Sequence, residues 1–155
     1  MTSTPNALIA TTAEPIKFVA TNVPVYAHDG SEPVKQPLAR AVLERLWASG
    51  TGVLSTQVLQ EFYAVATSLQ KLSMSPPEAR EIIELYSTWT VIVLEPALIL
   101  TASRLNERRS VAWWDALIME AARVAGAQRI LSEDLQDGQE LEGVRIENPF
   151  RPAEA

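Results

Sequence analysis

Near the N-terminus of this chain stands the segment Lys17-Phe18-Val19-Ala20-Thr21-Asn22-Val23, an apolar run that leads into a Thr-Asn pair. The apolar residues from Ile16 to Ala20 form a run of the length typical of a buried strand. Pro24 argues against a regular strand beyond the Thr-Asn pair. We therefore expect a first strand that ends at Ala20 and is followed at once by polar side chains.

Short apolar runs and segments of helical spacing alternate along the rest of the chain. Further strands are predicted at 52–55, 91–94, 129–132 and, at an edge, 144–146. Apolar residues recurring at i, i+3 and i+4, with Gly and Pro at several ends, predict helices at 37–49, 56–69, 75–88, 96–108 and about 113–125. This alternation predicts an α/β fold, a three-layer α/β/α arrangement in which helices cover both faces of a parallel sheet of four to five strands.

The length and composition set the domain organisation that we expect. A chain of 155 residues with 47% hydrophobic and 21% charged residues fits one globular domain. We place this domain at 16–148, after a disordered or loosely attached extension over 1–15 and before a frayed tail over 149–155. No apolar run approaches the roughly 18 residues that span a bilayer, and the extension lacks the charge and apolar core of a signal peptide. We therefore expect a cytoplasmic protein without membrane association.

The types of side chain in the chain limit the catalytic and metal-binding sites that it can form. The chain has no cysteine and a single histidine, His28, which excludes disulfides, thiol catalysis and sites with several histidines. Any metal ion should therefore be a hard cation held by oxygen ligands. The net charge of −6 argues against a broad basic surface for nucleic acid, but it is compatible with clustered carboxylates.

Glu61 is one of three acidic residues in positions where a carboxylate needs an explanation. On the predicted helix it lies at the edge of an apolar face, between Val58 and Val65. A carboxylate in that position costs free energy unless it is paired or bound to a metal. The alternative is a boundary glutamate whose carboxylate reaches water.

Asp115 and Asp134 are the other two acids whose positions need an explanation. Asp115 begins a helix that is apolar on most sides; it is either a site residue or a first-turn aspartate favoured by the helix dipole, and the dipole would keep it ionised in both cases. Asp134 follows the strand at 129–132, where a plain turn is the alternative. Ala20 also ends a strand. Since sites in parallel sheets form beyond the carboxyl ends of the strands, we expect these positions to lie near a site.

Four segments, taken in order, resemble a PIN-domain protein of the VapC toxin type over roughly 16–146. They are Phe18-Val19-Ala20-Thr21-Asn22, Leu59-Gln60-Glu61-Phe62-Tyr63, Trp114-Asp115-Ala116-Leu117-Ile118 and Ile130-Leu131-Ser132-Glu133-Asp134. The resemblance implies a ribonuclease dependent on Mg²⁺ or Mn²⁺. It also implies that Glu61, Asp115 and Asp134 are metal-site acids and that Asn22, Ser132 and Thr21 support them.

Ala20 departs from the family pattern, which has its first aspartate at this position. Loss of one ligand should weaken and displace a metal ion, so we expect an inactive or impaired nuclease. Two origins remain open, a deliberate Asp→Ala change that disarms a toxic enzyme and a natural loss. The resemblance further implies an RNA substrate, a cognate antitoxin and a homodimer, for which the helices at 37–49 and 56–69 carry enough apolar surface.

Two other functions compete with a nuclease. The first is a non-catalytic PIN-fold module that binds RNA or an antitoxin-like partner, and Ala20 is its main support. The second is a dinucleotide- or phosphate-binding enzyme, which is disfavoured because no Gly-rich loop follows a predicted strand. We interpret the tryptophans, Trp114 included, as core or interface residues rather than as platforms on which bases stack.

Overall fold

The computed structural model describes residues 14–151, so most of the predicted N-terminal extension and four residues of the predicted tail lie outside the described part. A single sheet runs through its centre in the order β3-β2-β1-β4-β6-β5. Its strands are β1 (Lys17–Val19), β2 (Gly52–Ser55), β3 (Thr90–Ile92), β4 (Arg129–Leu131), β5 (Glu140–Leu141) and β6 (Val144–Glu147). Neighbouring strands from β3 to β6 pair in parallel, and β5 pairs antiparallel with β6.

The sheet has one strand more than the four to five that the sequence predicts. The additional strand, β5, has two residues and forms a tight hairpin with β6. Both residues of the connecting turn, Glu142 and Gly143, have positive φ angles of 52° and 84°. Such angles suit a hairpin turn, and a two-residue strand is too short to show the alternation by which strands are predicted.

Within residues 14–151, six helices surround the sheet, and five of them lie close to their predicted positions. They are α2 (Asn22–Ala27), α3 (Lys35–Ser49), α4 (Thr56–Thr67), α5 (Pro76–Tyr86), α6 (Pro96–Arg109) and α7 (Trp113–Val124). The short helix α2 differs from the sequence prediction, in which Pro24 only argues against a strand. Pro24 is the third residue of α2, where a backbone N–H would have no partner within the helix in any case.

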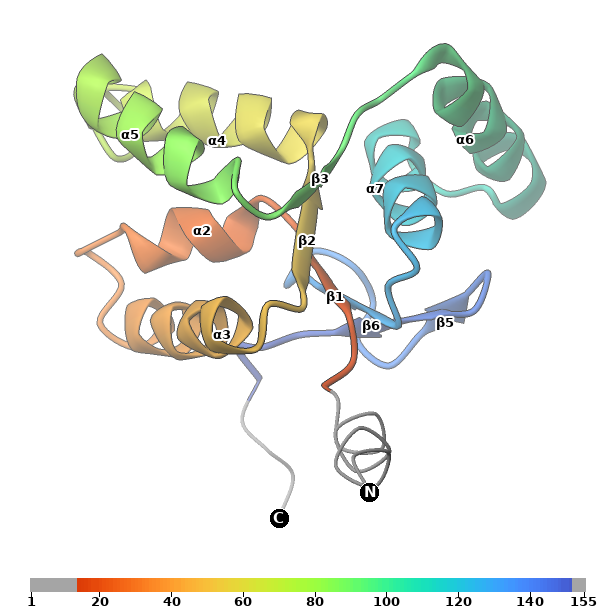
Figure 1. The fold of residues 1–155 in the computed structure, drawn as a ribbon, viewed down its shortest axis with the longest axis horizontal. Coiled ribbons are helices and arrows are strands. Elements are labelled where there is room, and N and C mark those ends of the chain that lie inside the picture. Colours follow the sequence, from red (N-terminus) through yellow and green to blue (C-terminus); the bar gives the residue numbers. More distant parts are fainter. Residues whose placement is uncertain (1–13, 152–155) are drawn as a thin grey trace, which may run out of the picture.

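The helices form a layer on each face of the sheet, which confirms the predicted three-layer α/β/α architecture (Figure 1). Helix α7 packs over β2, β4 and β6, and α6 lies against it. On the other side, α3 contacts β2 and packs against α2. Helix α4 contacts β2 and α5. None of the helices within residues 14–151 is long and apolar enough to cross a membrane.

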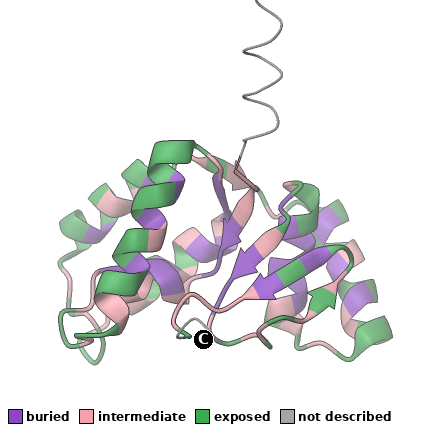
Figure 2. Cartoon of the chain, turned by 90° about the horizontal axis from the view of Figure 1, so that it is seen from below, coloured by how far each residue is buried: buried purple, intermediate pink, exposed green. Residues whose placement is uncertain are grey.

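The core lies along the central strands. Phe18, Val19, Leu54, Ile130 and Leu131 are fully buried, and Figure 2 shows the buried residues gathered on the strands and on the inner sides of the helices. These strands are apolar without alternation because helices cover both faces of the sheet.

The strand order reverses beside β1. From β1 the chain moves outward through β2 to β3, and it then returns to place β4 on the other side of β1. Because β1 and β4 are parallel, their carboxyl ends meet at one edge of the sheet. A reversal of this kind is where open α/β sheets form their ligand sites.

Candidate active site

A cavity of about 150 Å³ lies at the carboxyl ends of β1 and β4, and all seven residues singled out from the sequence line it. They are Ala20, Thr21, Asn22, Glu61, Asp115, Ser132 and Asp134. The cavity wall is completed by four residues that the sequence did not single out as site residues, namely Gln57, Trp114, Ile118 and Leu135.

Ala20 lies between the end of β1 and the start of α2, where two backbone hydrogen bonds hold it in place. Its backbone N–H donates to the carbonyl of Leu131 in β4 at 3.0 Å, and its carbonyl accepts from the N–H of Val23 at 3.2 Å. The residue is 6% exposed. A methyl group therefore occupies the part of the cavity wall where the family resemblance places a carboxylate.

Glu61 reaches the cavity from the second turn of α4. This helix starts at its cap Ser55, whose Oγ accepts from the N–H of Val58 at 3.4 Å. Thr21 Oγ1 donates to Glu61 Oε1 at 2.6 Å, and Gln57 Nε2 donates to Glu61 Oε2 at 3.3 Å. Both carboxylate oxygens are thus held by neighbouring side chains, and α2 and α4 are joined at the cavity.

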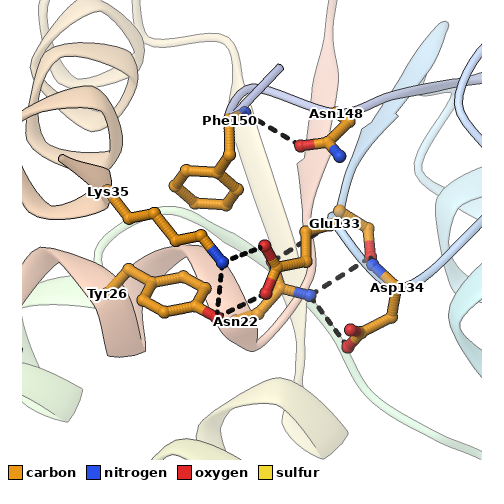
Figure 3. Close-up of polar contacts among 8 residues, drawn as sticks. Asn22, Tyr26, Lys35, Glu133, Asp134, Asn148 and Phe150 are labelled. Atoms are coloured by element: carbon orange, nitrogen blue, oxygen red, sulfur yellow. Dashed lines mark hydrogen bonds and ion pairs between the residues drawn. The ribbon is translucent and has the colours of Figure 1, made fainter. Parts of the chain in front are cut away.

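Asn22 links the end of β1 to the turn that follows β4. Its Nδ2 donates to Ser132 Oγ and to Asp134 Oδ2, both at 3.2 Å, and its Oδ1 accepts from the N–H of Glu133 at 3.3 Å (Figure 3). Ser132 is buried, and its Oγ also accepts from the N–H of Asp134 at 3.1 Å. Asn22 and Ser132 therefore set the orientation of Asp134.

Asp115 lies in the first turn of α7 and lines the cavity together with the other two acids. Burial raises the pKa of its carboxyl above the ordinary value, and the charges of Asp134 and Glu61 raise it further. The sequence predicts that the helix N-terminus favours the ionised form, and burial and the neighbouring carboxylates act in the opposite direction. The three acids repel one another, and a cation between them would relieve this repulsion.

Comparison with protein families identifies the framework around this cavity. The model of the family described as PIN domain matches residues 17–136, which is most of the chain. The chain belongs to the PIN-domain family.

A solved structure shows the same PIN fold. The Mycobacterium tuberculosis toxin VapC20, described as cleaving the sarcin-ricin loop, superposes with a TM-score of 0.60 over 83% of this chain and 98% of that chain. The two sequences are 21% identical, so the likeness is one of fold. No curated protein sequence matches the chain.

The oxygen atoms that line the cavity of this PIN domain are of the kind that hard cations bind, but they are not arranged closely enough to enclose one. Carboxylate, amide and hydroxyl oxygens line the cavity, and these are the ligands that Mg²⁺ and Mn²⁺ take. Within residues 14–151, however, no three Asp, Glu or His side chains lie close enough together to hold a metal ion. Several lining residues have no side-chain oxygen, and among them Ala20 is the one at whose position the family resemblance places a carboxylate.

A second polar cluster of the PIN domain lies just outside the cavity, between α2, α3 and the turn after β4. Lys35 Nζ donates to Glu133 Oε2 at 2.8 Å and to the hydroxyl oxygen of Tyr26 at 3.3 Å, and the Tyr26 hydroxyl donates to Glu133 (Figure 3). Phe150 packs edge-on against the Tyr26 ring, with the ring centroids 4.9 Å apart. No sequence pattern joins Tyr26, Lys35 and Glu133, so only the fold reveals this cluster.

Proposed function

We propose that this PIN domain is the scaffold of a Mg²⁺- or Mn²⁺-dependent endoribonuclease, the toxin of a toxin–antitoxin pair, and that Ala20 leaves it inactive or strongly impaired. The observation that carries the proposal is the convergence of Glu61, Asp115 and Asp134 on one cavity that Ala20 also lines. The RNA substrate is supported by the fold shared with VapC20, which is described as a toxin that cleaves the sarcin-ricin loop.

Each side chain has a role in this proposal. Glu61, Asp115 and Asp134 line one cavity but are too far apart to close around an ion in the free chain, so they would have to draw closer together to hold the metal. When bound, the metal would supply an activated water and compensate charge on the phosphate. Thr21 positions the carboxylate of Glu61. Asn22 positions that of Asp134, with Ser132 as a second contact. Without an acid at position 20 the cation would lie off its productive position, and a displacement of about 1 Å can cost about a hundredfold in rate.

The test is to supply the absent carboxylate with the substitution Ala20→Asp. We expect this variant to cleave RNA with Mg²⁺ or Mn²⁺ about a hundredfold faster than the parent chain, and chelation should abolish the cleavage. Ala20→Asn, which has nearly the same shape without the charge, is the matched control and should stay near the parent rate. A folded Ala20→Asp variant that cuts no RNA with either metal would refute the nuclease.

The alternative is a PIN-fold module that binds RNA or an antitoxin-like protein and has no chemistry. Its support is Ala20, which stands where the family pattern has its first aspartate. Mn²⁺ binding to the parent chain discriminates between the two functions. A disarmed nuclease should bind Mn²⁺ weakly through its three remaining acids and lose that binding in Asp115→Asn, whereas a pure interaction module needs no such affinity.

The partners of this toxin would be its RNA substrate, a cognate antitoxin and a second copy of the chain, all in the cytoplasm. The homodimer is supported by exposed apolar side chains on and next to α3 and α4, which include Leu38, Trp47, Tyr63 and Leu69. Exposed apolar side chains favour association where they can be buried against a second copy. Sedimentation of the parent chain over a range of concentrations should show a dimer, and a monomer at all concentrations would contradict this part of the proposal.

A further inference from the structure

A second hollow adjoins the carboxylate cavity. It has a volume of about 340 Å³, within the range typical of small-molecule sites, and is lined by Gln57, Gln60, Glu61, Ala64, Leu94 and Trp114. Gln57, Glu61 and Trp114 line both spaces, so the hollow continues directly from the site at which a phosphodiester would be cut.

Trp114 differs from the other tryptophans in its surroundings. Trp89 and Trp113 pack against the core, and the Trp47 ring lies 5.0 Å from that of Trp89. Trp114 is 62% exposed, and within residues 14–151 its indole pairs with no other aromatic ring. An exposed indole forgoes the free energy of burial, and its faces are available to a planar ligand.

Gln57 adds a polar group that lacks a partner in the same place. The residue is 5% exposed, and its Nε2 donates to Glu61 Oε2 and to the Trp114 carbonyl, both at 3.3 Å. Its Oε1 is buried and has no hydrogen-bond partner among the described residues. Exchanging the two amide atoms would set Oε1 against two acceptors, so the neighbours fix the orientation. A buried acceptor without a donor is costly, and a ligand N–H would remove that cost.

We propose that Trp114 and Gln57 form a nucleobase subsite for single-stranded RNA, next to the carboxylate cavity. The base beside the scissile phosphate stacks on the indole of Trp114 and donates an N–H to Gln57 Oε1. Because this oxygen is buried in the free chain, the Gln57 amide must move toward the hollow that it lines when the base binds. This inference rests on the proposed function, because it assigns part of the substrate to the hollow that adjoins the same site.

The charge of the chain favours stacking as the source of affinity. With a net charge of −6 the protein has little capacity to neutralise many phosphates. Aromatic platforms bind splayed bases of single strands through their π faces, without a basic groove along the whole backbone. We therefore expect RNA binding with a weak dependence on salt concentration.

The experiment uses the parent chain, whose Ala20 allows RNA to bind without being cut, and short fluorescently labelled single-stranded RNA. Trp114→Ala is expected to raise the Kd about five- to a hundredfold, the range for loss of one stacked base. Trp114→Phe keeps an aromatic face and should retain most of the affinity. Leu100→Ala is the control, since Leu100 is exposed to a similar extent, 58%, but lies on α6 and lines neither space.

Two further measurements separate a base contact from a change in shape. RNA with abasic positions should bind the parent chain and Trp114→Ala equally, because it offers nothing to stack. Gln57→Met, which removes the acceptor at similar length, should weaken the binding of ordinary RNA by about fivefold. If ordinary RNA binds the parent chain, Trp114→Ala and Gln57→Met with equal Kd, the subsite is refuted.

The outcomes distinguish this inference from the nuclease proposal. If Ala20→Asp cuts no RNA while Trp114→Ala still weakens RNA binding, the proposed nuclease activity is refuted and the proposed base subsite is supported. If Ala20→Asp cuts RNA, and adding Trp114→Ala changes neither the affinity for RNA nor the rate of cleavage, the base subsite is refuted and the nuclease activity is supported. If Trp114→Ala instead converts a dimer into a monomer at unchanged RNA affinity, the indole belongs to a protein interface and the inference is overturned.

Discussion

Glu133 connects the carboxylate cavity to α3 through the two partners of its side chain. Burial disfavours its ionised form, but hydrogen bonds from Lys35 and Tyr26 outweigh burial, and the pKa of Glu133 is lowered from its ordinary value. The N–H of the same residue donates to Asn22, which holds Asp134. The ion pair of Glu133 with Lys35 therefore supports the turn that carries one of the candidate metal ligands.

A single substitution tests that support. Glu133→Gln should lower the free energy of unfolding by about 1 kcal/mol at neutral pH, because a partly exposed, hydrogen-bonded ion pair is lost. Since the folded-state pKa is lowered, the stabilisation is present above the ordinary value of 4.5 and is lost as the pH falls through the folded-state pKa. Urea unfolding at pH 7 and near pH 3 should show the difference at the higher pH only. Glu84→Gln, an exposed acid on α5, is the control and should change neither.

At the scale of elements, the contact between β2 and the residue before β3 depends on a glycine. A Cβ built on Gly52 would lie 2.4 Å from Cζ3 of Trp89. The Trp89 ring also packs against Trp47 and Tyr86, with ring centroids 5.0 and 5.1 Å away, so it has little freedom to move. Any side chain at position 52 would therefore push this end of the sheet apart.

Gly52→Ala should consequently destabilise the protein by about 1–3 kcal/mol, the usual cost of overpacking. The matched control is Gly30→Ala, because a Cβ on Gly30 would meet no atom within 4 Å. Denaturant unfolding of both variants measures the contrast. Equal free energies of unfolding for the two variants would contradict the prediction and would mean that the Trp89 ring can move aside without loss of stability.

At the scale of the whole molecule, a cation at the cavity would join elements from both ends of the chain. The candidate ligands come from α4, α7 and the turn after β4, and position 20 follows β1. A metal that binds only the folded chain stabilises it by about 2.7 kcal/mol when its concentration is a hundred times its Kd.

The Ala20→Asp variant should therefore respond to metal more strongly than the parent chain. Without metal we expect its Tm to lie below that of the parent, because a fourth carboxylate adds repulsion; with saturating Mn²⁺ the order should reverse. Metal binding needs Asp115 ionised, and its pKa is raised by burial first and then by Asp134 and Glu61. The Mn²⁺-dependent rise in Tm should accordingly grow as the pH increases through that pKa. Equal Mn²⁺ effects on Ala20→Asp and Ala20→Asn would contradict a role for the added charge.

The amino-acid sequence by itself determined the layered fold. Apolar runs and helical spacing depend on neighbouring residues only, so they predicted the parallel sheet with its covering helices. The same local patterns placed an acid or a polar residue after several strand ends. The departure at Ala20 is evident only from the resemblance to the PIN family. Local patterns were insufficient for α2 and β5, since one contains a proline and the other has two residues.

The tertiary structure decided what depends on residues far apart in the chain. Asn22 and Asp134 are separated by 112 positions, yet they are hydrogen-bonded because β1 and β4 are neighbours in the sheet. The raised pKa of Asp115 comes from its burial and from acids on other elements, and the exposure of Trp114 depends on how α7 packs within the fold. A pKa, a shared cavity and an exposed ring are properties of packing, and packing is set only when the whole chain has folded.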